Sequence, residues 1–256
     1  MQSTTIRKGK FYNNIIGHHG ANSFALDSKK YAIRCDEGDN SYLRIADPGY
    51  ITTGDFTFTF SMRANDGIPT TGPFALTSGF TSRVHSVNGT MRVNLYDGFN
   101  NVVMDSTINV CDGEWHTIIF SADRSGDVEL YIDYDVDTLS WAEEVSADIS
   151  SVGDIESAGS MDDWAFGFDG VARYSGIDVD QIAIFDSISA PSHVLPTAIA
   201  ASKHLGLELH NTIGITPIAY WQCNTLGGGA GIPNEGSESD VLHVYNDPVL
   251  IEDGIM

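Results

Sequence analysis

Phe56-Thr57-Phe58-Thr59-Phe60-Ser61-Met62-Arg63 is the stretch that decides the fold class. Its apolar residues occupy every second position. Successive side chains of a β-strand point to opposite faces, so the run predicts a strand with one buried and one solvated face. Similar runs recur at residues 91–96, 115–120, 128–133, 164–168, 181–185, 218–222 and 241–245. Many short strands with little helical pattern predict an all-β antiparallel sandwich of two sheets.

Turn and helix signals complete this outline. The turn pairs Asn88-Gly89 and Asp97-Gly98 flank one run, and residues 123–126 are expected to join two others into a hairpin. One short helix is expected near residues 191–204, where Pro196 limits its length. No break in composition divides the chain. We therefore expect residues 24–256 to form a single domain and residues 1–23 to form an N-terminal arm.

The charge and cysteine content narrow the function classes. The formal net charge is −22, from 13 basic and 35 acidic residues, and such a surface repels nucleic acids and anionic membranes. The three cysteines are odd in number and widely spaced, which argues against a zinc site and a disulfide-stapled module. Residues 1–10 are polar, so no signal peptide is expected.

Several runs resemble concanavalin A-like and laminin G-like domains. Asp112-Gly113-Glu114-Trp115-His116 resembles the "DG-x-WH" strand start of that family, and Tyr131-Ile132-Asp133 resembles the end of its next strand. Residues 180–189 resemble the closing strand, and residues 42–45 with residues 53–57 resemble the opening pair. The matches run in the family's order from about residue 24 to residue 190. The resemblance implies a jelly-roll sandwich, and a shared fold says little about activity.

The C-terminal part has a resemblance of its own. Residues 217–221 followed by a Gly-rich loop at residues 225–240 resemble the end of laminin G-like proteins on bacteriophage particles. This implies a non-enzymatic virion surface protein, a capsid decoration or tail-associated protein, assembled in the host cytoplasm. Other virion proteins would be its partners, with Arg7, Lys8 and Lys10 as candidate contacts, and host glycans a further ligand. A stand-alone glycan-binding lectin is the alternative, and a glycoside hydrolase or polysaccharide lyase a third.

No catalytic centre is predicted. The chain has no G-x-S-x-G, no H-E-x-x-H and no E-x-D-x-x-E motif. Glu129, Tyr131, Asp133 and Asp135 would share one face of a regular strand. Glu129 and Asp133 would then be roughly 13 Å apart, beyond the reach of a glycosidase carboxylate pair, whereas Asp133 and Asp135 would be nearer to each other. His116 alternates with apolar residues, so we expect it to be a buried structural histidine.

Binding candidates are aromatic or acidic. Sugar recognition needs an exposed aromatic ring with polar neighbours, and the candidates are Trp141, Trp164, Tyr174, Tyr220 and Trp221. Asp178 and Asp180 are candidate calcium ligands, because hard cations prefer several oxygen donors. Acidic turns offer a simpler explanation of that pair, and no other cofactor is expected.

Overall fold

In a computed structural model of the chain, the described residues are 31–35, 41–46, 54–64, 74–75, 83–87, 89–135, 138–155, 163–167, 176–186, 217–223, 231–233, 235–236, 241–246 and 248–252. Every regular element among them is a β-strand, so the all-β fold class predicted from the alternation is confirmed. The helix expected near residues 191–204 and the arm expected at residues 1–23 lie outside the described residues. No helix in the described part of the chain is long and apolar enough to cross a membrane.

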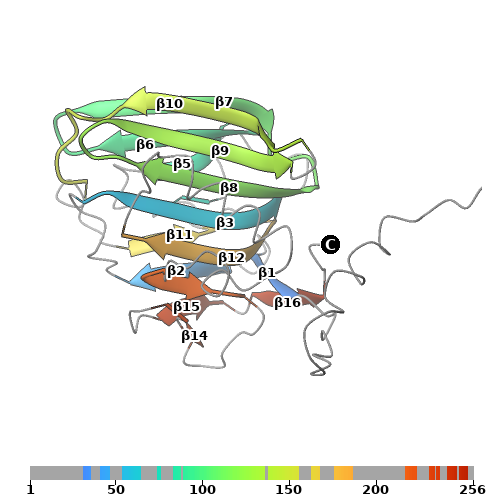
Figure 1. Cartoon of the computed structure of the whole chain (residues 1–256). Coiled ribbons are helices and arrows are strands. Elements are labelled where there is room, and N and C mark those ends of the chain that lie inside the picture. Colours follow the sequence, from blue (N-terminus) through green and yellow to red (C-terminus); the bar gives the residue numbers. More distant parts are fainter. Residues whose placement is uncertain are drawn as a thin grey trace, which may run out of the picture.

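The described residues form sixteen strands (Figure 1). They are β1 (Tyr31–Cys35), β2 (Tyr42–Ala46), β3 (Phe56–Ala64), β4 (Phe74–Ala75), β5 (Arg83–Val87), β6 (Thr90–Tyr96), β7 (Asn101–Asn109), β8 (Trp115–Ala122), β9 (Asp127–Asp135), β10 (Ser140–Asp148), β11 (Asp163–Phe166), β12 (Ile177–Phe185), β13 (Ala219–Trp221), β14 (Ile232–Pro233), β15 (Val241–Tyr245) and β16 (Val249–Glu252). The runs predicted from alternation fall on β3, β6, β8, β9, β11, β12, β13 and β15.

These strands make three antiparallel sheets. An eight-stranded sheet has the order β10-β9-β8-β3-β12-β1-β16, with β13 pairing with the second half of β12. A five-stranded sheet has the order β14-β15-β2-β11-β4, and a three-stranded sheet has the order β5-β6-β7. The hairpin expected at residues 123–126 joins β8 to β9, and the Asp123 amide donates to the Asp127 carbonyl across it.

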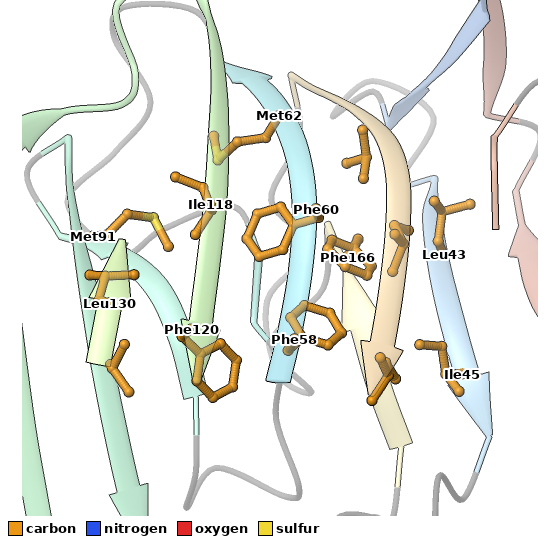
Figure 2. Packing of buried hydrophobic residues seen from close by; sticks show 14 of the residues in the cluster. Leu43, Ile45, Phe58, Phe60, Met62, Met91, Ile118, Phe120, Leu130 and Phe166 are labelled. Atoms are coloured by element: carbon orange, nitrogen blue, oxygen red, sulfur yellow. The ribbon is translucent and has the colours of Figure 1, made fainter. Parts of the chain in front are cut away.

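One continuous core lies between the eight-stranded sheet and the two smaller sheets (Figure 2). Phe58 and Phe120 come from the eight-stranded sheet, Leu43 and Phe166 from the five-stranded sheet, and Met91 from the three-stranded sheet. The rings of Phe58 and Phe166 stack across the layers with centroids 6.2 Å apart. The protein is therefore a two-layer sandwich, with the smaller sheets sharing the second layer.

Strand β3 differs from its prediction in one respect. Its apolar residues face the core as expected, but Thr57, Thr59 and Ser61 on the other face are also buried. The Thr57 and Ser121 hydroxyls lie 2.8 Å apart, so this second buried face is partly satisfied by hydrogen bonds between neighbouring strands. The expectation that this face is solvated is wrong, because buried side chains of the two neighbouring strands, Ile119 on β8 and Phe185 on β12, flank it in register.

The two layers are joined at one edge by a carboxylate. Glu143 on β10 accepts hydrogen bonds from the backbone amides of Thr107 and Ile108 and from the Thr107 hydroxyl, at 2.7 to 3.0 Å. Both amides belong to β7, the outer strand of the three-stranded sheet. This carboxylate closes the side of the sandwich where two edge strands meet.

Candidate functional site

The segment that carries the family resemblance builds a hydrogen-bonded corner at the start of β8. His116 is buried, and both of its ring nitrogens meet carboxylates. Nδ1 lies 2.6 Å from Asp133 Oδ2, and Nε2 lies 3.0 Å from Asp112 Oδ1. Asp112 also accepts from the Glu114 amide. The prediction that His116 is a buried structural histidine is confirmed. The aspartate and the histidine of the "DG-x-WH" pattern are hydrogen-bonded to each other.

The charges of this corner favour a protonated imidazole. Burial alone would lower the pKa of His116, but hydrogen bonds and charge from Asp133 and Asp112 outweigh it and raise that pKa above its ordinary value. The pKa of Asp112 is lowered: its partial burial acts in the opposite direction, but the Glu114 amide and His116 stabilise the carboxylate. An imidazolium between two carboxylates holds the two chain segments together.

Asp133 reaches His116 because the backbone of β9 turns over at this residue. Its φ is 51°, in the left-handed region that aspartate tolerates better than most residues. Its other carboxylate oxygen accepts from the Thr117 amide at 2.8 Å. The expectation that Glu129, Tyr131 and Asp133 share one face is therefore wrong. Asp133 turns toward the His116 side of the sheet, while Glu129 accepts a hydrogen bond from the Tyr131 hydroxyl.

The two aspartates predicted to bind calcium form hydrogen bonds with other groups of the chain. Asp178 is 3% exposed and lies in register between Arg34 on β1 and Arg63 on β3. Its carboxylate accepts from both guanidinium groups at 2.6 to 2.9 Å, and Asp180 accepts from the Gln181 amide. The described residues contain no cluster of histidine, cysteine and carboxylate groups suited to a metal ion. The calcium interpretation of Asp178 is therefore replaced by a charge-paired strand contact.

Two of the five predicted sugar platforms are inaccessible. Trp221 is fully buried and Tyr220 is 2% exposed. Strand β13 pairs with β12, so Trp221 packs into the core between the layers and Tyr220 packs into the second buried cluster on the outer face of the sheet. Neither can present a ring to a sugar in this structure. The backbone of Trp164 pairs with Ile45, but its side chain is not among those described. Tyr174 lies outside the described residues altogether.

Trp141 is the predicted platform that the structure leaves accessible. It is partly exposed, and its ring lies 5.0 Å from the rings of both Tyr131 and Tyr134, measured between centroids. Tyr131 is buried and alternates with core residues of β9, so this cluster covers the outer face of the eight-stranded sheet. Glu144 lies opposite Tyr131 in register and is exposed. We call Tyr131, Tyr134, Trp141 and Glu144 the Trp141 patch.

A second aromatic group was not predicted from the sequence. Tyr42 on β2 and Tyr245 on β15 pair in register, and their rings are parallel within 2° with centroids 4.6 Å apart. The Arg44 guanidinium carbon lies 6.0 Å from the centre of the Tyr245 ring, and the ring of His243 lies 6.3 Å from it. All four side chains are partly exposed. We call Tyr42, Arg44, His243 and Tyr245 the Tyr245 patch.

The sequence contains one signal for the Tyr245 patch. Tyr42 and Arg44 alternate with the core residues Leu43 and Ile45, which places them on the outer face of a strand. What the sequence does not show is that β2 and β15, some 200 residues apart in the chain, are hydrogen-bonded neighbours. The pattern therefore predicts an exposed tyrosine but not its partner.

Comparison with known proteins identifies structures with a similar fold. No protein-family model matches the sequence, and no curated protein matches it. A candidate carbohydrate-binding protein from Bacteroides ovatus ATCC 8483 superposes with a TM-score of 0.59 and 12% identity over 88% of this chain. The chain spans 60% of the length of that protein.

Two further solved structures align with parts of this chain. The native heptameric SAP-like pentraxin from Limulus polyphemus superposes with a TM-score of 0.50 and 12% identity over 88% of this chain and 96% of its own. The LG1-3 region of the laminin alpha2 chain aligns with a TM-score of 0.45 and 20% identity over 61% of this chain and 31% of its own. The Bacteroides ovatus protein and the pentraxin show the fold to be a jelly-roll sandwich of the concanavalin A-like kind.

Proposed function

We propose that this chain is a non-enzymatic glycan-binding module and that the Trp141 patch is a sugar platform. The observation that carries the proposal is the position of Trp141, which is partly exposed and whose ring contacts two tyrosine rings. The C–H face of a pyranose packs on such a ring, and hydroxyl groups at the sugar rim need polar partners.

The Trp141 patch supplies both kinds of contact. Trp141 is fixed by its contacts with Tyr131 and Tyr134, so little side-chain entropy is lost when a ligand docks. Glu144 is exposed and lies opposite Tyr131 in register, and the Tyr134 hydroxyl makes no hydrogen bond within the described part of the chain. A carboxylate and a phenol are groups that accept from and donate to sugar hydroxyls.

The carboxylates near the patch support binding over cleavage. A glycosidase needs two carboxyl groups facing one bound sugar, about 5 to 9.5 Å apart. Asp133 is turned to His116, and Glu129 is engaged by the Tyr131 hydroxyl. The similarity to a candidate carbohydrate-binding protein from Bacteroides ovatus also supports a binding role.

The test is a binding screen with matched variants. Soluble β-1,3-glucan, mannan, galactan and xylan would be titrated into the wild-type chain, Trp141→Ala and Phe99→Ala. Phe99 is 94% exposed at the β6–β7 turn, so its replacement removes an exposed ring away from the patch. We expect Trp141→Ala to lose the binding event at this patch, with an affinity there at least about tenfold weaker, and Phe99→Ala to bind as the wild type does. Absence of binding to every polysaccharide, or equal binding by Trp141→Ala, would overturn the proposal.

The setting we propose for this activity is the surface of a bacteriophage particle, as a capsid decoration or tail-associated protein assembled in the host cytoplasm. The support is the resemblance of residues 217–221 and the Gly-rich stretch 225–240 to phage laminin G-like proteins, together with the −22 charge that would keep crowded copies apart. Antibody labelling of purified particles tests it. Signal in the particle fraction at a fixed number of copies supports it, and signal only in the soluble fraction refutes it.

A further inference from the structure

We infer that the Tyr245 patch is a second glycan-binding site, so that one chain binds two separate neutral polysaccharide strands and cross-links them. The inference rests on the proposed function and adds a site on the opposite layer of the sandwich. The first step is the shape of the patch. Tyr42 and Tyr245 stand side by side on neighbouring strands, with parallel rings and centroids 4.6 Å apart. Such a pair forms a rigid aromatic ridge, because each ring limits the rotation of the other.

The second step is the set of hydrogen-bonding groups at the ridge. Arg44 Nη1 lies 3.5 Å from the Tyr245 hydroxyl oxygen, which leaves the phenolic proton able to donate elsewhere. The imidazole of His243 makes no hydrogen bond within the described residues, although its ring contacts Tyr245. A donor hydroxyl and an imidazole beside an aromatic ridge are suited to the hydroxyl groups of a sugar whose C–H face packs on the ring.

The third step is the position of the two patches. Tyr42 alternates with core residues of the five-stranded sheet, and Tyr131 alternates with core residues of the eight-stranded sheet. The core lies between these sheets, so the patches are on opposite outer faces. In Figure 1, β9 and β10 lie near the top while β2 and β15 lie near the foot. One short oligosaccharide therefore cannot occupy both, and two sites on one rigid body engage two strands.

The fourth step is the charge of the ligand. The chain has 35 acidic and 13 basic residues, and an exposed carboxylate, Glu144, belongs to the Trp141 patch. Sulfated or uronic-acid polymers would be repelled by this field at low ionic strength. The Tyr245 patch contains the cation Arg44 and the Trp141 patch contains a carboxylate, so the ligand class that suits both patches is a neutral polysaccharide.

The experiment combines stoichiometry with cross-linking. A short oligosaccharide of the neutral polysaccharide bound in the screen would be titrated by calorimetry, and turbidity would be followed when the chain is mixed with the full polymer. We expect two oligosaccharides per wild-type chain and a turbid mixture. Trp141→Ala and Tyr245→Ala should each bind one oligosaccharide and leave the mixture clear, while Phe99→Ala behaves as the wild type.

Two further variants protect the test from a folding defect. Tyr245→Phe keeps the ring pair and removes the donor hydroxyl, and His243→Ala removes the imidazole; both should weaken the second binding event severalfold. One oligosaccharide per wild-type chain, lost in Trp141→Ala, would overturn the second site while leaving the proposed function intact. Turbidity that persists in both Trp141→Ala and Tyr245→Ala would mean that association between chains causes the cross-linking, and this result would also overturn the second site. Absence of all polysaccharide binding would overturn the proposed function itself.

Discussion

Replacing His116 by alanine should destabilise the chain by an amount that depends on pH. The imidazole bridges Asp133 and Asp112, which are 17 and 4 residues away in sequence, so it holds the start of β8 to the end of β9. Removing it leaves two carboxylates without their shared donor. It also leaves a cavity where a side chain with 7% exposure was packed.

The magnitude follows from the two hydrogen bonds. Each joins a charged donor to a carboxylate, and such bonds contribute about 1.5 to 3 kcal/mol. The Asp112 and Asp133 side chains are 41% and 34% exposed, so water partly replaces the lost donor and the lower end applies. We therefore expect a loss of about 3 kcal/mol at pH 6. The neutral ring can donate only one hydrogen bond, so the loss should fall to about 1.5 kcal/mol at pH 9.

The direction of the pH effect follows from linkage. The folded chain raises the pKa of His116 above its unfolded value of about 6.5. The stabilisation is therefore complete below that unfolded value and is lost as the pH rises through the folded pKa. Urea unfolding followed by tryptophan fluorescence, at constant ionic strength from pH 6 to pH 9, measures the free energy of unfolding of the wild type and of His116→Ala.

Asp133→Asn is the matched control. Asparagine also tolerates a φ of 51°, and its carbonyl oxygen can accept the hydrogen bond from His116, but it carries no charge and leaves the Thr117 amide without its acceptor. Its stability should therefore be lower than that of the wild type at each pH and should depend less on pH. A loss in His116→Ala that is equal at pH 6 and pH 9 would refute the charged bridge. A wild-type stability that rises over this range more than that of the variant would reverse the sign and refute it as well.

Three further predictions concern buried groups. Asp178→Ala should lower the free energy of unfolding by about 3 kcal/mol, because Arg34 and Arg63 lose a carboxylate that is 3% exposed; urea titration measures this, and a loss below about 1 kcal/mol would contradict it. Glu143→Ala should speed hydrogen exchange at the Thr107 and Ile108 amides by about tenfold, whereas the exposed neighbour Glu144→Ala should leave both rates unchanged. Burial raises the pKa of Cys35 to about 12, with the charge of Asp178 acting in the same direction, so a thiol reagent at pH 8 should leave Cys35 unmodified in the folded chain and label it in urea.

The sequence predicts the central strands well because their two faces have different neighbours. In β3 the core positions Phe56, Phe58, Phe60 and Met62 alternate with polar residues, and that alternation survives in the structure. Strand β10 has no comparable signal: its sequence Ser-Trp-Ala-Glu-Glu-Val-Ser-Ala-Asp is rich in small and acidic residues. It becomes a strand because eight of its residues pair with β9. Tertiary pairing of this kind overrides local preference, and a single sequence does not contain it.

For strand β12 the local sequence was misleading, because it suggested exposure where the structure shows burial. Asp178 and Asp180 suggested an exposed acidic turn, yet every residue of β12 is buried. A bulge at Gln181, where φ is 50° and the register with β3 shifts, lets Ile177 and Val179 face the core before it and Ile182 and Ile184 after it. The two aspartates are left on the outer face, where arginines from both neighbouring strands reach Asp178.

The binding groups follow the same division between local pattern and long-range pairing. Trp141 was predicted as a platform from its local sequence, and its exposure depends on β10 being an edge strand that lays the ring on Tyr131 and Tyr134. Tyr245 acquires its aromatic partner only when β15 pairs with β2. The Tyr245 patch therefore lies where two strands distant in sequence are neighbours, whereas the Trp141 patch lies on the consecutive strands β9 and β10. The partly exposed side chains on the outer faces of the sheets, such as Trp141 and Tyr245, do not fill the core, so they can vary while the fold stays the same, which is how one sandwich can serve many ligands.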